Sequence, residues 1–172
     1  GTNYGGASHW NVGGWTVGST VDDVGFVDAL LDTLTADYNI NTDRVYSTGM
    51  SNGGYMSFLL ACQLSDRIAA IASITGSMTP ETFTACNPQH PTPVLQIHGD
   101  ADGTVPYNGA SWTKSIDDVL DYWTNYNNCG AADTTAMPDI NTSDGSTVDQ
   151  IDFDYGDNCS YVSHFKVYGG GH

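Results

Sequence analysis

Positive charge is the scarcest property of this 172-residue sequence. Four lysines and arginines stand against twenty aspartates and glutamates, which gives a formal net charge of −16. A surface this acidic repels the phosphates of nucleic acids and the head groups of anionic lipids. We therefore expect neither a nucleic-acid partner nor a membrane partner.

Long apolar runs are also missing. The sequence has no stretch of about 18 consecutive apolar residues, as a membrane-spanning helix requires, and no basic-then-apolar N-terminus typical of a signal peptide. A signal peptide that had been removed would leave no trace. Hydrophobic residues make up 40% of the chain, which is enough for a core, and the length fits a single domain over residues 1–172.

The cysteines lack the paired C-x-x-C spacing of a zinc site, and we expect no metal and no cofactor. They are Cys62, Cys86, Cys129 and Cys159. An even number in an acidic chain rich in glycine, asparagine and serine fits two disulfides in an oxidising compartment, and thus a secreted protein. Four unpaired buried thiols are the alternative. If two disulfides form, the sequence leaves three connectivities open.

Hydrophobic periodicity predicts an α/β architecture. The glycine-rich residues 1–20 show no periodicity and are predicted to form a loop. Apolar residues at helical spacing predict helices over about 21–38, from Gly54 to near Asp66, and over 112–127. Strands are predicted at 44–48, 68–75, 93–98 and 164–168. Such alternation indicates a mainly parallel sheet with its ligand site beyond the carboxyl ends of the strands.

Ser51 lies between a predicted strand and a predicted helix, in the sequence STGMSNGGYM of residues 47–56. A G-x-S-x-G pattern arises easily by chance in a chain rich in glycine and serine, so its context decides. Strand, turn and helix are the context of a nucleophile elbow. Ser51 is therefore a candidate nucleophile. The backbone N–H of Asn52 is a candidate for one half of an oxyanion hole, and no loop before residue 21 could supply the other half.

A serine nucleophile needs a histidine base that is oriented by a carboxylate. In α/β-hydrolases these follow in the order serine, acid, histidine, which leaves His164 and His172. His164 begins an alternating strand, as a residue on one sheet face would. His172 follows three glycines directly after that strand and is the preferred base. Asp100 and Asp102 are both candidates for the acid, and position alone does not separate them.

Six segments together carry a resemblance to a known family. They are HWN at 9–11, VDDVGF at 21–26, DRVYSTGMSNGGYM at 43–56, LACQLSDRIAAIASITG at 60–76, PVLQIHGDADGTVPYNG at 93–109 and VYGGGH at 167–172. The chain resembles, over nearly its whole length, the secreted esterases that include poly(3-hydroxybutyrate) depolymerases, feruloyl esterases and acetylxylan esterases. The resemblance implies the α/β-hydrolase fold, a mainly parallel sheet with helices on both faces.

The resemblance also implies roles for individual residues. HGDADGTVPY matches the family pattern with the acid at Asp102, GGGH places the base at His172, and Ser51 matches the nucleophile. The suggested disulfides are Cys62 with Cys86 and Cys129 with Cys159. Members of the family begin with further strands and an HG-type oxyanion loop and continue beyond GGGH. We therefore expect these residues to be a fragment that lacks the N-terminal strands.

The expected activity is that of a secreted serine esterase acting on feruloyl or acetyl esters of plant polysaccharide. Hydrolysis of poly(3-hydroxybutyrate) or short polyesters is the alternative substrate class, and a noncatalytic carbohydrate-binding domain on the same fold is an alternative of another kind. The oligomeric state is not predicted. Five aromatic residues could stack on a sugar or phenolic ring or could cover the core: Trp10, Trp15, Tyr55, Tyr107 and Trp112.

Overall fold

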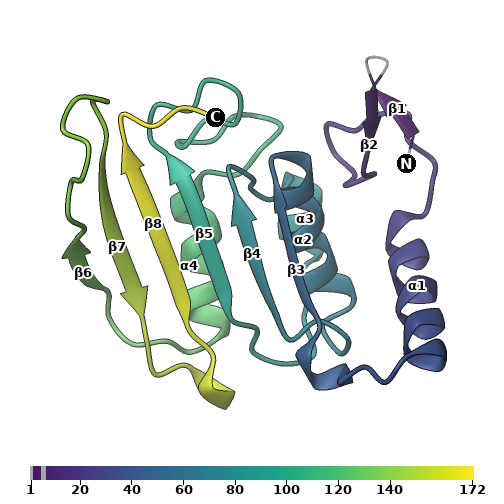
Figure 1. The fold of residues 1–172 in the computed structure, drawn as a ribbon. Coiled ribbons are helices and arrows are strands. Elements are labelled where there is room, and N and C mark those ends of the chain that lie inside the picture. Colours follow the sequence, from purple (N-terminus) through teal and green to yellow (C-terminus); the bar gives the residue numbers. More distant parts are fainter. Residues whose placement is uncertain (1, 5–6) are drawn as a thin grey trace.

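A six-stranded sheet forms the centre of the computed structural model, which describes residues 2–4 and 7–172 (Figure 1). The strands follow the order β3-β4-β5-β8-β7-β6. They are β3 (Tyr46–Met50), β4 (Ala70–Ile74), β5 (Val94–Gly99), β6 (Asp133–Ala136), β7 (Thr147–Phe153) and β8 (Val162–Tyr168). The pairs β3–β4, β4–β5 and β5–β8 are parallel, whereas β7 is antiparallel to both β8 and β6. The predicted mainly parallel α/β sheet is confirmed.

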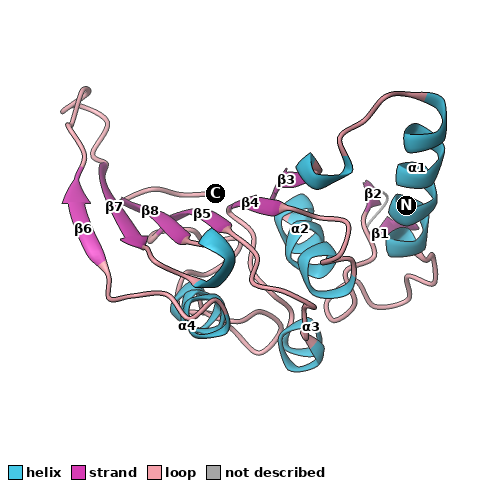
Figure 2. Ribbon diagram, turned by 90° about the horizontal axis from the view of Figure 1, so that it is seen from below, coloured by secondary structure: helices cyan, strands magenta, loops and turns pink. Residues whose placement is uncertain are grey.

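Four α-helices accompany the sheet in the described chain. They are α1 (Asp23–Asp37), α2 (Asn52–Gln63), α3 (Pro80–Ala85) and α4 (Ile116–Tyr126), with short 3-10 turns at Thr42–Arg44 and Asp157–Cys159. Figure 2 shows α2, α3 and α4 on one face of the sheet and α1 beyond the edge formed by β3. Side chains of Asp22, Thr79 and Ser115 cap the first turns of α1, α3 and α4. The three predicted helices are confirmed.

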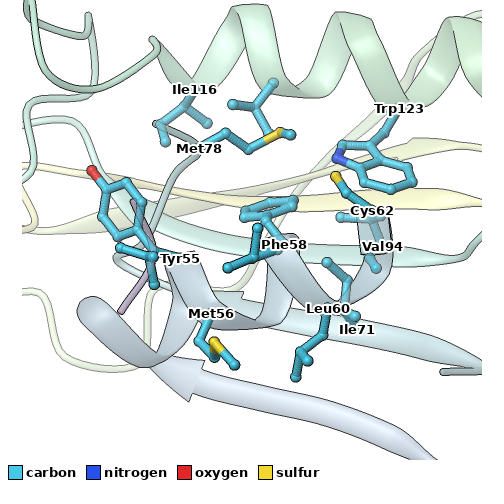
Figure 3. Close-up of a cluster of buried hydrophobic side chains, with 14 of the residues drawn as sticks. Tyr55, Met56, Phe58, Leu60, Cys62, Ile71, Met78, Val94, Ile116 and Trp123 are labelled. Atoms are coloured by element: carbon cyan, nitrogen blue, oxygen red, sulfur yellow. The ribbon is translucent and has the colours of Figure 1, made fainter. Parts of the chain in front are cut away.

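The main core lies between the sheet and the helices α2 and α4 (Figure 3). Phe58 of α2 and Trp123 of α4 are fully buried and stack with ring centroids 6.3 Å apart. Val94 of β5 and Val162 of β8 close the core from the sheet side. These contacts give α2, α4 and the two strands a fixed mutual position, so the loops that follow β5 and β8 start from a rigid base.

One of the two expected disulfides forms. Cys62, near the end of α2, is bonded to Cys86, directly after α3, as the resemblance implied. Cys129 and Cys159 are free thiols, which corrects the expectation of a second pair. Cys159 is exposed and has a φ of +58°, whereas Cys129 is partly buried and burial raises its pKa. The two thiols thus lie in different environments.

Several elements differ from the sequence-based prediction. The N-terminal region is not all loop, because β1 (Thr2–Tyr4) and β2 (Ala7–His9) form an antiparallel hairpin. In the sequence, a Gly-Gly pair between short runs is a pattern typical of hairpins, and residues 5 and 6 themselves lie outside the described part. The strands β6 and β7 were missed because DTTA and TVDQIDF are acidic and polar. The short helix α3 was also not predicted.

Candidate active site

Ser51 forms the whole turn between β3 and α2. Its φ of 53° and ψ of −117° place it in a region that residues other than glycine rarely adopt. A Cβ atom on Gly49 would lie 2.5 Å from the carbonyl carbon of Gly53, so a glycine there lets strand and helix approach closely. The Ser51 N–H donates to the Ile74 carbonyl of β4 at 2.8 Å. This is the strained strand–turn–helix arrangement of a nucleophile elbow.

Asp102 lies in the turn after β5, and its side chain is completely buried. Its Oδ1 atom accepts hydrogen bonds from the backbone N–H groups of Thr104 and Val105, both at 2.8 Å. Its Oδ2 atom lies 2.8 Å from His172 Nδ1. Burial opposes the charged form, but the hydrogen bonds from His172, Val105 and Thr104 outweigh it and hold the pKa of Asp102 below its usual value. The group is therefore a carboxylate at neutral pH.

Asp100 has a different partner. Its Oδ1 atom accepts a hydrogen bond from the Gly169 N–H at 2.7 Å, and its own N–H donates to the Val167 carbonyl at 3.0 Å. A Cβ atom on Gly99 would come within 2.1 Å of the Gly170 oxygen, so the loop after β8 lies directly against the end of β5. Asp100 therefore binds the backbone of the loop after β8, whereas Asp102 contacts the side chain of His172 at the end of that loop.

The two late histidines have contrasting environments. His164 is fully buried on β8, where its Nδ1 lies 3.1 Å from the Gln96 oxygen and its Nε2 lies 3.1 Å from the Tyr107 hydroxyl. Burial lowers its pKa to about 4. The side chain of His172 is 23% exposed, and only its Nδ1 atom is engaged by Asp102. His172 is thus the accessible one of the two.

Ser51 and His172 lie at the same edge of the sheet. Ser51 follows β3 and His172 follows β8, and Figure 1 shows the C-terminus beyond the carboxyl end of β5, which lies between them. Among the described residues no hydrogen bond joins Ser51 to His172. The candidate acid Asp102 and the candidate base His172 are therefore in contact, and the candidate nucleophile Ser51 lies at the same edge without a hydrogen bond to His172 in the described residues.

Asn52 has two distinct parts in this site. Its backbone N–H belongs to the first turn of α2, where N–H groups have no partner within the helix. Its side chain makes two hydrogen bonds to the Trp10 backbone: Oδ1 accepts from the N–H at 2.7 Å, and Nδ2 donates to the carbonyl at 3.1 Å. The sequence alone did not reveal this second role, because the two residues are far apart in the chain.

A hollow of about 480 Å³ adjoins the elbow. Its lining comes from two segments, one at the end of β2 and one around Ser51. The lining residues are Ser8, His9, Trp10, Met50, Asn52 and Gly53. The Trp10 side chain stays 36% exposed there. The hollow therefore offers an aromatic surface and a thioether directly beside the candidate nucleophile.

The other four aromatic candidates cover the core. Tyr55 and Tyr107 are buried. Trp15 is partly buried and packs edge-on against Tyr55 and Trp112, with ring centroids 5.4 Å and 6.2 Å away. Of the five aromatic residues considered for stacking, Trp10 remains available beside the elbow.

The described residues contain no group of three or more histidine, cysteine, aspartate or glutamate side chains arranged to hold a metal ion. No helix among the residues described is long and apolar enough to cross a membrane.

A protein-family profile described as Phospholipase/Carboxylesterase matches residues 22–135, well over half of the chain. The chain belongs to this family. The matched range contains Ser51, Asn52 and Asp102 and ends before His172. The resemblance to esterases is thereby confirmed at the level of the family.

Curated relatives of this carboxylesterase-family chain include three fungal esterases. A bifunctional acetylxylan esterase/xylanase XynS20E of Neocallimastix patriciarum is 29% identical over 97% of the chain, which covers 22% of that protein. Feruloyl esterase B of Piromyces equi is 36% identical over 58% of the chain, covering 19% of its length. Feruloyl esterase C of Emericella nidulans is 28% identical over 92% of the chain and is covered to 53%. The chain thus spans about half of these relatives or less.

The solved structures support the fold of this carboxylesterase-family chain. An acetyl xylan esterase from Aspergillus awamori superposes with a TM-score of 0.64 over 87% of this chain and 62% of its own length. The two sequences are 13% identical in that comparison, so the likeness shows the α/β-hydrolase fold alone. The predicted α/β fold class is confirmed, but α2, α3 and α4 lie on one face of the sheet and not on both (Figure 2).

Proposed function

We propose that the protein containing this chain is a serine esterase in which Ser51, His172 and Asp102 act as one catalytic unit. The observation that carries the proposal is the 2.8 Å contact between His172 Nδ1 and the buried Asp102 carboxylate at the sheet edge where Ser51 forms a strained elbow. Membership of the carboxylesterase family supports the same chemistry. Residues 1–172 would form part or all of the catalytic domain.

The first half of the reaction would form an acyl-enzyme. A carboxylate accepts hydrogen bonds and cannot donate them, so Asp102 fixes the proton of His172 on Nδ1 and leaves Nε2 as the base. Nε2 would take the Ser51 hydroxyl proton as Oγ attacks the ester carbonyl carbon. The resulting tetrahedral intermediate collapses when His172 returns that proton to the departing alcohol oxygen. Asp102 stabilises the imidazolium that exists between these two proton transfers.

The second half would release the acid. Water attacks the acyl carbon, Nε2 of His172 takes one water proton, and the Ser51 oxygen leaves as the same proton returns to it. In both halves the substrate oxygen carries negative charge, and the Asn52 N–H at the α2 N-terminus would donate to it. The helix dipole favours an anion at this position as well.

The proposed substrates are feruloyl or acetyl esters on plant polysaccharide. The relatives named as feruloyl and acetylxylan esterases support this class. Trp10 and the hollow beside Ser51 would give a ring of the substrate a surface to stack on. Polyester remains the alternative substrate. The Cys62–Cys86 disulfide supports an extracellular location, because disulfides persist in oxidising compartments.

The experiment is a substrate panel with the full protein: methyl ferulate, acetylated xylan and poly(3-hydroxybutyrate), each with wild type and Ser51→Ala. We expect wild type to hydrolyse one of the first two at least ten times faster than the polyester. Ser51→Ala should be inactive on all three. Preference for the polyester would replace the substrate class, and equal activity of Ser51→Ala would contradict the esterase mechanism.

A further inference from the structure

A second histidine lies beneath the Asp102 turn. His98 is on β5, between β4 and β8, and its side chain is completely buried. Its Nε2 atom lies 2.9 Å from the Val105 carbonyl oxygen and 3.4 Å from Asp102 Oδ2. Oδ2 is the same oxygen that His172 contacts. The proposed mechanism assigns no role to His98.

The partners of His98 determine which ring nitrogen carries the proton. Gln96 Nε2 lies 3.0 Å from His98 Nδ1 and donates a second bond to the Gly76 carbonyl at 2.9 Å, which fixes its amide as a donor on this side. Nδ1 of His98 must therefore accept. The Val105 carbonyl can only accept, so Nε2 must carry the proton.

His98 also bears a neutral ring. Burial lowers its pKa, the backbone hydrogen bonds to Val105 and Gly76 and the charge of Asp102 offset this only in part, and His172 acts in the same direction as burial. A neutral ring with its proton on Nε2 presents one N–H to the Asp102 turn and no lone pair. The short separation from Asp102 is thus a contact between a neutral donor and a carboxylate.

The contacts around Val105 form a closed arrangement. Its N–H donates to Asp102 Oδ1 at 2.8 Å, while its carbonyl lies 2.9 Å from His98 Nε2. The two backbone polar groups of Val105 are thus both hydrogen-bonded, the N–H to the Asp102 carboxylate and the carbonyl to the His98 ring on β5. The orientation of the carboxylate toward His172 depends on that turn keeping its shape.

We infer that His98 is a positioning residue for the proposed esterase reaction, in which its Nε2–H holds the Asp102 turn and the carboxylate oxygen that orients His172. This inference rests on the proposed function. His98 does not touch the reacting atoms and acts through Asp102. The atom that carries the effect is one N–H, so a side chain that restores this donor should restore the effect.

The chain offers a matched control for the loss of a buried imidazole. His164 is equally buried and lies within hydrogen-bonding distance of Gln96 and Tyr107, but no hydrogen bond or ion pair joins it to Asp102 in the described chain. Replacing it should destabilise the protein as replacing His98 does, without disturbing the carboxylate. Comparison of the two separates positioning from general stability.

The experiment uses the full protein with the variants His98→Leu, His98→Gln and His164→Leu, assayed on p-nitrophenyl acetate. His98→Leu should lower kcat on the order of 10²-fold with KM changed less than about twofold, because a misplaced base acts on the chemical step. His98→Gln should recover kcat to within about tenfold of wild type, since its Nε2 can reach the same acceptors. His164→Leu should lose as much Tm as His98→Leu but keep kcat within about threefold.

A spectroscopic readout makes the test independent of catalysis. In the Ser51→Ala background, the strongly deshielded proton of the His172 Nδ1–H group should be observed by NMR with His98 or Gln at position 98. With Leu at this position it should be shifted or lost. Failure of the proposed function would appear as activity in Ser51→Ala itself, whereas this signal reports on the contact between Asp102 and His172 alone.

Two results would overturn the inference: a folded His98→Leu variant with wild-type kcat and an unchanged proton signal, or an equal loss of kcat in His98→Leu and His164→Leu. If His98→Leu does not fold, His98→Asn replaces it, because its amide is one carbon too short to reach the Nε2 position. Equal kcat in His98→Asn and His98→Gln would then contradict the role of the donor.

Discussion

Two helices of this chain, both predicted from apolar residues at helical spacing, differ sharply in burial. In α4, Ile116, Val119 and Trp123 are fully buried against the sheet. In α1, Phe26 and Leu30 remain 53% and 41% exposed, and Asp23 is the buried residue of that helix. The apolar residues of α4 gather on one face far more strongly than those of α1, and that face is the one that is buried.

The same contrast divides the candidate site. We call α4, β5 and β8 the closed side, and α1 with β3 the open side. On the closed side both strands have a neighbour on each edge, and the Asp102–His172 contact is complete. On the open side β3 pairs only with β4 among the described strands, and Tyr46 and Met50 are 63% and 54% exposed. The proposed acid and base lie on the closed side, and the proposed nucleophile lies on the open side.

The largest expected effect separates the two carboxylates of the closed side. In the full protein, Asp102→Ala should lower kcat for a p-nitrophenyl ester on the order of 10⁴-fold, because His172 loses its orientation and its charge partner. Asp100→Ala removes only a bond to the Gly169 backbone and should cost about tenfold or less. Steady-state kinetics of both variants measures this difference. Equal losses would mean that the loop after β8 matters as much as the acid.

The disulfide should be the next largest contributor. Reducing Cys62–Cys86, or replacing both residues by Ala, should lower the free energy of unfolding by roughly 3 kcal/mol in the chain-entropy model. The double variant Cys129→Ala/Cys159→Ala is the matched control and should change it much less. Denaturant unfolding measures both. Thiol titration of the unfolded, unreduced chain should find two thiols, and a count of zero would show that the second pair also oxidises.

His164 should make the closed side sensitive to acid. Its pKa in the folded protein is lowered from 6.5 to about 4, so between these values the unfolded chain binds more protons than the folded one. Stability should therefore fall as the pH drops from 6.5 to 4, by up to about 3 kcal/mol for this group. The lowered pKa of His98 acts in the same direction. Denaturant unfolding measures this. In His164→Leu the free energy of unfolding should change less between pH 6.5 and pH 4 than in wild type, and an equal change would contradict the lowered pKa of His164.

The smallest expected effect concerns the open side. Residues 1–172 expressed alone should self-associate through the exposed β3 edge and α1, because unpaired edges and exposed apolar side chains favour association. Met50→Lys should weaken association by on the order of 1 kcal/mol. Tyr155→Lys, at an exposed site in the loop after β7, is the control. Sedimentation velocity over a concentration series measures the self-association of both variants. Equal weakening by Met50→Lys and Tyr155→Lys would contradict association through the open side.

Local signals account for the parts of the fold that the sequence predicted well. The helices and the buried strands follow from apolar periodicity, and the elbow follows from Ser51 lying between a strand run and a helix run. The hairpin of β1 and β2, the short helix α3 and the strands β6 and β7 escaped because their sequences are glycine-rich, short or polar. The strand β7 is held in the sheet by antiparallel pairing with β8, and this pairing cannot be predicted from the local sequence of β7.

The site shows the same limit more clearly. Asp100 and Asp102 both follow β5 within three residues, and the return of the loop after β8 distinguishes them, through contacts with residues about 70 positions away. The hydrogen bond from His98 Nε2 to the Val105 carbonyl depends on the shape of the turn after β5, which no spacing of residues in the sequence predicts. The pairing of Cys62 with Cys86 followed from the resemblance, whereas Cys129 and Cys159, which the resemblance also paired, are free thiols.

The most direct test of the central claim is mass spectrometry of the full protein after reaction with a fluorophosphonate probe. If Ser51 on the open side is activated by His172 and Asp102 on the closed side, one adduct should form, on the peptide that contains Ser51. Ser51→Ala should form none, and His172→Ala and Asp102→Ala should react at least about 10³-fold more slowly. Labelling of another serine, or labelling of Ser51 at the same rate without His172, would contradict the account.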